Sequence, residues 1–313
     1  MTFEIIITKE YAGLKPKSFL KKRIDIPYFK IPRLLKDKRI TLNGKKIHED
    51  SVLKEGDVIK VWPNDINPVE QKKFHFDSKD LEIPIIFENE DFIVFNKSAG
   101  IIVQGAQDNA TSLSLHLAHY KQQIGDKSDF EYFHAHRLDK ETSGILVVAK
   151  NRQTLRDLNQ IFREKNIVKK YVCLCLGYFE KKEGQVEAFM RKNELGIKEK
   201  MTICSAKEKD AERSLSLYKV LKEYEHDKED FSLVEVEIKT GITHQIRVHM
   251  RSLEHPILGD KLYGNSTVNR VYEKILNRQF LHAKYLEFEY KGKKYVFEAE
   301  LTDDLKSMLN LLE

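Results

Sequence analysis

The chain has 313 residues, of which 41% are hydrophobic and 33% charged, the composition of a folded globular protein with one large domain or two. No apolar run approaches the roughly 18 residues of a membrane span, and the short, acidic start is unlike a secretion signal. Three cysteines without framework spacing predict a reducing compartment, so we expect a cytoplasmic protein that is not membrane-bound.

Positive charge is concentrated at the N-terminal end of the chain. The whole sequence has a net charge of +5, but residues 1–62 hold 15 Lys and Arg against 8 Asp and Glu, a net of +7. The remaining residues therefore carry a net charge of −2. A compact basic segment joined to a near-neutral body predicts a polyanion-binding module beside a second domain.

The basic segment reads as two short helices followed by a small hairpin sheet. Residues 17–24 and 29–36 predict the helices, and residues 39–47 form an alternating strand that enters an Asn43-Gly44 turn, the strongest short hairpin signal. A further turn and strand end near Trp62. Five cations of this segment are candidates for contact with phosphate: Arg33, Lys36, Lys38, Arg39 and Lys45.

The rest of the chain predicts a strand-rich second domain. Residues 64–80 are polar and patternless and predict a linker, so we expect domains at 1–63 and 81–313. Strands are expected at 83–97 (two around an acidic turn), 145–150, 169–177, 234–238 and 295–301. Helices are expected at 111–123, 151–166 and 305–312. Without a regular βαβ rhythm, the fold class is α+β with a mixed, mainly antiparallel sheet.

The most distinctive string runs from His136 to Gly144, His-Arg-Leu-Asp-Lys-Glu-Thr-Ser-Gly, and leads directly into a continuous apolar strand. Asp139 is flanked by cations that favour its ionised form, and Thr142 and Ser143 can donate hydrogen bonds. A scaffold holds reactive side chains in loops at the mouths of buried strands, so Asp139 is the candidate reactive group.

This string resembles the signature of the RluA-type RNA pseudouridine synthases. Three further strings resemble motifs of that family in the same order: Lys169-x-Tyr171, residues 240–249 (TGITHQIRVH) and residues 256–264 (PILGDKLYG). Residues 15–62 resemble the S4 RNA-binding domain. The resemblance implies a pseudouridine synthase catalytic domain that follows an S4-like module. Two positions depart from the family pattern: Ser98 replaces a proline and Ile242 an arginine.

The resemblance also implies roles for particular residues. It makes Asp139 the catalytic carboxylate, Arg247 its bidentate partner and Tyr171 the wall that stacks on the base and assists proton removal. The target base must leave its stack in the RNA, and Arg137 is expected to fill the gap. Further substrate contacts are expected from His136, Lys169, His244 and Gln245. Because both bonds that change belong to one nucleotide, no cofactor and no metal are expected.

Other readings of the sequence remain open at this point. The family resemblance favours large-subunit ribosomal RNA as substrate, with transfer RNA as the alternative. The Ile242 departure motivates a non-catalytic RNA-binding protein. Scattered histidines and Asp260 motivate a metal-dependent hydrolase, although no recognised metal-ligand spacing supports it. Nothing resembles a dimer seam, so we expect a monomer.

Overall fold

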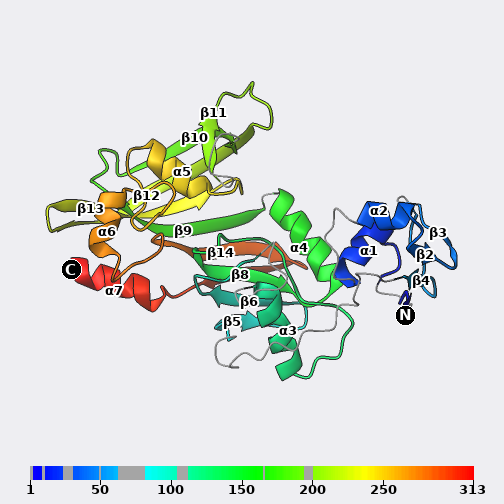
Figure 1. Ribbon diagram of the computed structural model, residues 1–313. Coiled ribbons are helices and arrows are strands. Elements are labelled where there is room, and N and C mark those ends of the chain that lie inside the picture. The colour runs from blue at the N-terminus through cyan, green and yellow to red at the C-terminus, as the bar shows by residue number, and fades with distance from the viewer. Residues whose placement is uncertain are drawn as a thin grey trace. The chain divides into compact units, whose positions relative to one another are not determined.

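The computed structural model divides the chain into two compact units, residues 1–76 and 77–313 (Figure 1). Each unit has its own sheet and its own hydrophobic core. The linker expected at 64–80 lies outside the described residues. The described residues are 3–8, 11–23, 31–48, 51–62, 82–103, 112–164, 166–193 and 200–313.

The smaller unit combines a four-stranded antiparallel sheet with two short helices. Its strands lie in the order β1-β4-β2-β3 and are β1 (Phe3–Ile6), β2 (Ile40–Leu42), β3 (Lys45–Lys46) and β4 (Val58–Val61). Its helices are α1 (Pro16–Arg23) and α2 (Ile31–Lys36). Phe19, Leu20 and Leu35 of the helices share a buried core with Ile40 and Ile59 of the sheet.

The predicted Asn43-Gly44 hairpin is confirmed. Both residues have positive φ, 50° and 75°, which a two-residue turn between twisted strands requires. The Asn43 side-chain oxygen also accepts the Val58 N–H at 2.8 Å, which fixes the turn against β4. Strand β1 was not anticipated, because the start of the chain carries no turn signal of its own.

The larger unit is built on one eleven-stranded sheet (Figure 1). Its main path runs β11-β10-β12-β13-β9-β14-β8-β6-β5, while β15 pairs with β14 and β7 with β8. Neighbouring strands are antiparallel except β14 and β8, so the predicted α+β class with a mainly antiparallel mixed sheet is confirmed. The strands are β5 (Ile85–Glu88), β6 (Phe92–Lys97), β7 (Phe133–His134), β8 (Ser143–Ala149), β9 (Ile167–Leu176), β10 (Glu183–Lys192), β11 (Met201–Cys204), β12 (Glu212–His226), β13 (Glu229–Ile238), β14 (Leu281–Tyr290) and β15 (Lys293–Glu298).

Five helices accompany this sheet. They are α3 (Leu113–Gln123), α4 (Arg152–Glu164), α5 (Gln245–Ser252), α6 (Ser266–Tyr272) and α7 (Asp303–Leu312). Helices α3, α4 and α7 lie where the sequence predicted them. Helix α5, which packs against β11 and β12, was not predicted, because its short motif carries too few residues for a clear helical period. The strand expected at 295–301 ends earlier, at Glu298.

The centre of the sheet explains the apolar run after the signature. All seven residues of β8 are buried: Leu146 and Val148 face one core, while Ile145 and Val147 face another. A strand covered on both faces has no polar alternation. Gly144, the second residue of this strand, has φ 110°, and a Cβ there would lie 2.3 Å from the Ala283 carbonyl oxygen of β14. Only glycine fits this crossing of β8 and β14.

Candidate active site

Asp139 lies in the loop between β7 and β8, and its side chain is 21% exposed. The Thr142 N–H donates to the Asp139 carbonyl at 3.1 Å, and the Gln279 amide donates to Thr142 Oγ1 at 3.2 Å. Ser143 Oγ lies 2.9 Å from His282 Nδ1. Thr142 and Ser143 are buried, so they brace the loop itself and leave the Asp139 carboxylate facing outward.

A buried lysine holds the same loop from the β6 side. Lys97 ends β6 and donates to the carbonyls of Ser98 (2.8 Å), Ile101 (3.3 Å) and Lys140 (3.2 Å). Burial lowers the pKa of Lys97 to about 7, and the positive charge of Arg278 adds to this effect. No role was predicted for Lys97, although a lysine that ends an apolar strand was a visible signal.

A buried arginine holds the loop from the opposite side. Arg278 donates to the Glu141 carbonyl at 3.1 Å and to Ser143 Oγ at 3.2 Å. It also pairs bidentately with Asp304 at the start of α7, at 2.6 and 3.0 Å. The carbonyls of Lys140 and Glu141, next to Asp139, are therefore fixed by two cations from different elements. Nothing in the sequence pattern pointed to Arg278.

Arg247 divides its guanidinium between two carboxylates. Its Nη1 donates to Asp139 at 3.1 Å, while Nε and Nη2 donate to both oxygens of Asp260 at 2.7 and 2.8 Å. The bidentate partner is thus Asp260, which corrects the prediction that the fork grips Asp139. Burial alone would raise the pKa of Asp260, but the hydrogen bonds and charge of Arg247 outweigh it and hold the pKa below its usual range.

His244 provides a second contact to Asp139. It precedes α5 with φ 57°, and its Nε2 lies 3.7 Å from Asp139 Oδ2. Its Nδ1 lies 3.0 Å from the Tyr263 hydroxyl, which accepts the Met201 N–H at 2.7 Å. Because that oxygen already accepts a hydrogen bond from the Met201 N–H, its own O–H can donate to His244 Nδ1, which favours the tautomer with Nε2–H toward Asp139. Tyr263 belongs to one of the family-like strings, but no role was predicted for it.

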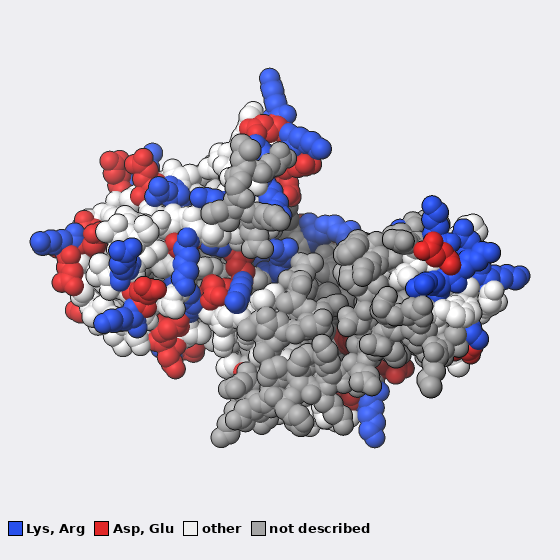
Figure 2. Space-filling view, viewed as in Figure 1, with Lys and Arg blue, Asp and Glu red and all other residues white. Residues whose placement is uncertain are grey.

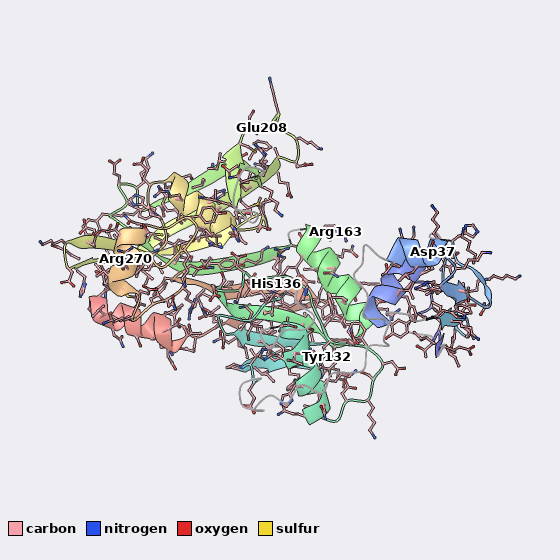
Figure 3. All side chains as sticks on the ribbon, in the orientation of Figure 1. Asp37, Tyr132, His136, Arg163, Glu208 and Arg270 are labelled. Atoms are coloured by element: carbon pink, nitrogen blue, oxygen red, sulfur yellow. The ribbon has the colours of Figure 1, made fainter. Side chains whose placement is uncertain are left out.

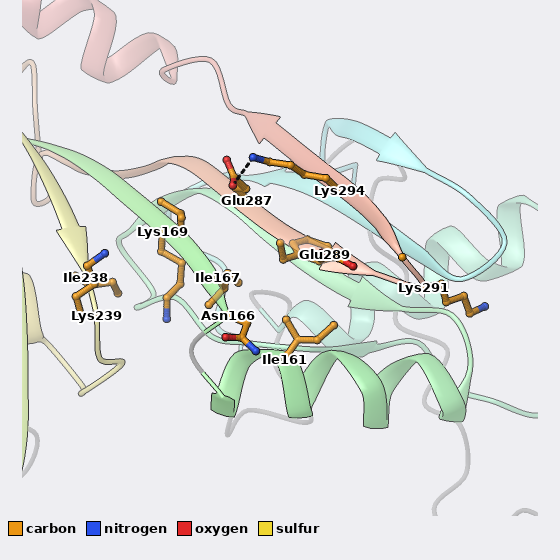
Figure 4. Close-up of a pocket in the computed structure, with 13 residues that line it drawn as sticks. Ile161, Asn166, Ile167, Lys169, Ile238, Lys239, Glu287, Glu289, Lys291 and Lys294 are labelled. Atoms are coloured by element: carbon orange, nitrogen blue, oxygen red, sulfur yellow. Dashed lines mark ion pairs between the residues drawn. The ribbon is translucent and has the colours of Figure 1, made fainter.

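Tyr171 and Lys169 lie two residues apart on β9, so their side chains leave the same face of the sheet. Tyr171 is 8% exposed, and burial, reinforced by the negative charge of Asp139, raises the pKa of its hydroxyl. The hydroxyl therefore keeps its proton at neutral pH. Lys169 lines a groove of about 880 Å³, shown in Figure 4, with its Nζ 5.9 Å from the centre of the Phe162 ring.

Two predicted substrate contacts have other partners in the structure. The Gln245 amide is buried; its oxygen accepts from Thr240 Oγ1 (2.7 Å) and from the Ile242 N–H (3.1 Å), while its nitrogen donates to the Leu215 carbonyl and Ser216 Oγ, both at 3.0 Å. No donor or acceptor is left for a base, so Gln245 shapes the loop before α5 instead.

His136 also differs from its prediction. Its ring stacks on Phe162 of α4 at 4.7 Å, and its Nε2 accepts the Val147 N–H of β8 at 3.1 Å. Figure 3 labels His136 among the side chains of the larger unit. Burial, helped by the charge of Lys169, lowers the pKa of His136 to about 3. A neutral, packed imidazole supports the loop, whereas the neighbouring Arg137 is exposed and lies two residues before Asp139.

Ile242 has a packing role that accounts for its apolar character. It lies against a small buried cluster that contains Met190, Met201, Val248 and Tyr263. The side chain therefore joins the loop before α5 to the β10–β11 side of the sheet. An arginine at this position would gain an RNA contact only by giving up that packing.

The basic residues of the smaller unit lie on its surface. Lys36, Lys38 and Lys45 are exposed and Arg39 is half-buried, while the side chain of Arg33 is outside the described part. Figure 2 shows the Lys and Arg side chains gathered over this unit. Among the described residues, no group of three or more His, Cys, Asp or Glu could hold a metal ion. None of the described helices is long and apolar enough to cross a membrane.

Comparison with known proteins identifies the family of this chain. The family model for RNA pseudouridylate synthase matches residues 91–252, which include Asp139, Tyr171 and Arg247. The chain belongs to the RNA pseudouridylate synthase family. The resemblance of the larger unit to the RluA-type pseudouridine synthases is thereby confirmed, and the protein is an RNA pseudouridine synthase.

Similar proteins span nearly the whole synthase. It is 32% identical to the ribosomal large subunit pseudouridine synthase C of Buchnera aphidicola, over 98% of this chain and 96% of the relative. The same figures hold for the protein of that name from Escherichia coli K12. Human RNA Pseudouridylate Synthase Domain Containing 1 superposes with a TM-score of 0.60 at 25% identity, over 71% of this chain and 84% of that one.

Proposed function

We propose that this synthase converts uridines of large-subunit ribosomal RNA into pseudouridine. The observation that carries the proposal is the placement of one partly exposed carboxylate, Asp139, against Arg247 and His244 and beside buried Tyr171. The choice of ribosomal RNA rests on the relatives named for the large ribosomal subunit, which match 98% of the chain.

The reaction rearranges one nucleotide and leaves its atoms unchanged. The bond between uracil N1 and ribose C1′ breaks, the uracil turns, and C5 bonds to C1′; the proton lost from C5 is balanced by one gained at N1. Asp139 supplies the carboxylate on which these bond changes in the nucleotide depend. Arg247 and His244 orient it, and one of its oxygens remains free of Arg247. Tyr171, kept protonated by its raised pKa, forms the wall on which the base stacks.

The exposed residues around Asp139 are suited to extract the base from RNA. Arg137 projects from the same loop, and its planar guanidinium can occupy the stack that the flipped uridine leaves. Lys169 lies on the groove beside the site and can contact a phosphate. Arg137→Ala is expected to lower turnover while RNA binding falls less than about tenfold, measured by single-turnover kinetics and filter binding. Equal losses in both would assign Arg137 to binding alone.

The function is tested by mapping pseudouridine in cells. Ribosomal and transfer RNA from cells with and without the gene are treated with carbodiimide and read by primer extension. The deletion is complemented by wild type or Asp139→Ala. Stops in large-subunit ribosomal RNA that wild type alone restores are the expected result. Restored stops in transfer RNA would show that transfer RNA is the substrate instead. If no stop changed in either RNA, a non-catalytic RNA-binding protein would be favoured.

We propose that the smaller unit is an S4-like module that grips structured RNA. Its helix pair, its hairpin and its exposed Lys36, Lys38 and Lys45 support this role. Removing residues 1–62 is expected to weaken RNA binding and to flatten its dependence on salt, because each phosphate contact adds roughly one to the slope. Filter binding across a salt series measures both quantities. An unchanged slope would contradict the module's role.

We propose further that the synthase acts as a monomer in the cytoplasm. One chain supplies Asp139, Tyr171 and Arg247, so the site needs no second copy. Buried Cys173 and Cys175 are both free thiols, their sulfurs 3.6 Å apart, which fits a reducing compartment. Sedimentation velocity should give a species of 36.7 kDa, and cell fractionation should place it with the ribosomes. A dimer or a secreted pool would contradict these assignments.

A further inference from the structure

A second hollow adjoins the catalytic residues on the side of β11. It has a volume of about 420 Å³ and is formed by β11, the face of α5 that follows Arg247, and the segment around Tyr263. Tyr263 belongs to both places: its hydroxyl lies 3.0 Å from His244, and the Arg247 guanidinium lies 5.1 Å from the centre of its ring. Tyr263 is therefore shared between the lining of the hollow and the contacts that hold His244 and Arg247 beside Asp139.

The charge of the hollow is positive. Arg251 follows Arg247 by one helical turn on α5, so the two side chains leave the same face about 6 Å apart. Arg247 is committed to Asp260 and Asp139, whereas the side chain of Arg251 is exposed and makes no hydrogen bond or ion pair within the described ranges. Lys200 lies on the other side, its Nζ 5.5 Å from the centre of the Tyr263 ring. No Asp or Glu is among the described residues that line the hollow.

The remaining lining combines apolar side chains, which suit a flat or ribose-like group, with the polar Thr202 and Ser252. Val248 is buried in the floor, Leu262 is half-buried, and Ile203 is 42% exposed beside them. Other arginines on this sheet are paired, as Arg191 is with Glu208 and Arg213 with Glu187, both on β10–β12. Arg251 and Lys200 thus lie beside apolar side chains near the catalytic residues, whereas the arginines of the neighbouring strands are paired with glutamates.

We propose that this hollow is a nucleotide subsite, which holds the ribose and phosphate next to the flipped uridine. Arg251 and Lys200 bind the phosphate, and Val248, Leu262 and Ile203 contact the sugar or base. This inference rests on the proposed function, because it needs RNA in the site.

The test combines binding, salt dependence and phosphate ethylation interference on an unmodified large-subunit ribosomal RNA transcript. The proteins are wild type, Arg251→Ala and Lys200→Ala, with Arg270→Ala and Lys274→Ala as matched controls, because those exposed cations lie on or just after α6, outside the hollow. Random ethylation reveals which phosphates the protein needs, whichever uridine is the target. The same transcript is assayed for pseudouridine.

We expect Arg251→Ala and Lys200→Ala each to weaken binding about tenfold and to lower the salt slope by about one. Interference at a phosphate beside the modified uridine should be lost in these two variants and kept in the controls. An unchanged slope and an unchanged interference pattern would overturn the subsite, even if the transcript is modified. Loss of the subsite contact in the binding assay without any pseudouridine in wild type would uphold the subsite and reject the proposed function.

Discussion

Arg247 assigns different tasks to two carboxylates. Asp260 is fully buried and accepts two bonds from Arg247 and two more from the backbone N–H groups of Leu262 and Tyr263. Asp139 receives a single bond from Arg247 and is partly exposed. A saturated carboxylate can only hold the arginine in place, whereas one with free lone pairs can react. Asp260 is thus a positioning residue for Arg247, and Asp139 remains available to the substrate.

Asp260→Asn is expected to lower both stability and turnover. The substitution removes the bidentate partner of an arginine whose side chain is 6% exposed and leaves it a single carboxylate bond, to Asp139, so we expect a loss of about 3 kcal/mol. Arg247 then turns from Asp139, so kcat should fall more than KM rises. Thermal unfolding and steady-state kinetics on an RNA transcript measure these effects.

Asp139→Asn is the matched comparison, because it also removes one carboxylate from Arg247. Here the two bonds to Asp260 survive and no buried charge loses its partner. We expect turnover to fall at least about a thousandfold while the unfolding temperature stays within about 2 °C of wild type. If the two variants lost equal stability, the division of roles between the two carboxylates would be wrong.

At the scale of elements, the catalytic loop is fixed by parts of the chain that lie far from it in sequence. Lys97 at the end of β6 holds one carbonyl, and Arg278, just before β14, holds the next. Arg278 is in turn oriented by Asp304 and Thr302 at the start of α7. The last helix of the chain therefore contributes to the position of Asp139, although it contains no residue of the site.

Asp304→Asn tests this connection. Losing the carboxylate weakens the bidentate bond to Arg278, so we expect kcat to fall about tenfold with little change in KM, and Asp304→Glu to recover part of it. Asp303→Asn is the control, since it removes an exposed charge from the same helical turn. Kinetics under single-turnover conditions separate the two. If Asp303→Asn and Asp304→Asn lowered kcat equally, the effect would come from a general disturbance of α7, and the specific role of the Asp304–Arg278 pair would be contradicted.

At the scale of the whole molecule, the larger unit keeps several histidines neutral in its interior. His249 bonds to Ser214 and Ser216, and His282 to Ser143. Burial lowers the pKa of each to about 4, and that of His136 to about 3. Unfolding returns each imidazole to an ordinary pKa of about 6.5, so the unfolded chain takes up protons that the folded one refuses.

The synthase should therefore lose stability as the pH falls below about 6.5, with the loss continuing toward pH 4. For each of these histidines, the free energy of unfolding should fall by about 2 kcal/mol as the pH is lowered from 7 to 5. His249→Gln should reduce the change in unfolding free energy between pH 7 and 5 by about 2 kcal/mol. His48→Gln, which replaces an exposed histidine, should leave that change as it is in wild type. Urea unfolding at several pH values measures the slope. A slope independent of His249 would contradict its neutral burial.

The sequence by itself determined the family, the fold class and most elements of the larger unit. The apolar run of β8 and the apolar face of α4 are local patterns, and the His136–Gly144 string is contiguous. All three can therefore be recognised without a structure. The Asn43-Gly44 hairpin followed in the same way from the backbone preferences of two adjacent residues. Local signals of this kind survive folding because neighbouring residues stay neighbours.

Only the tertiary structure decided which groups hold the reactive carboxylate. Arg247 lies 108 residues from Asp139, and it meets Asp260 more closely than Asp139 because the segment after α5 turns back beside that helix. Gln245 and His136 are polar residues in the expected motifs, yet packing directs them into the protein. Lys97, Arg278 and Tyr263 gained their roles from contacts between distant elements. Sequence spacing carries no record of such contacts, since they depend on how strands and helices cross.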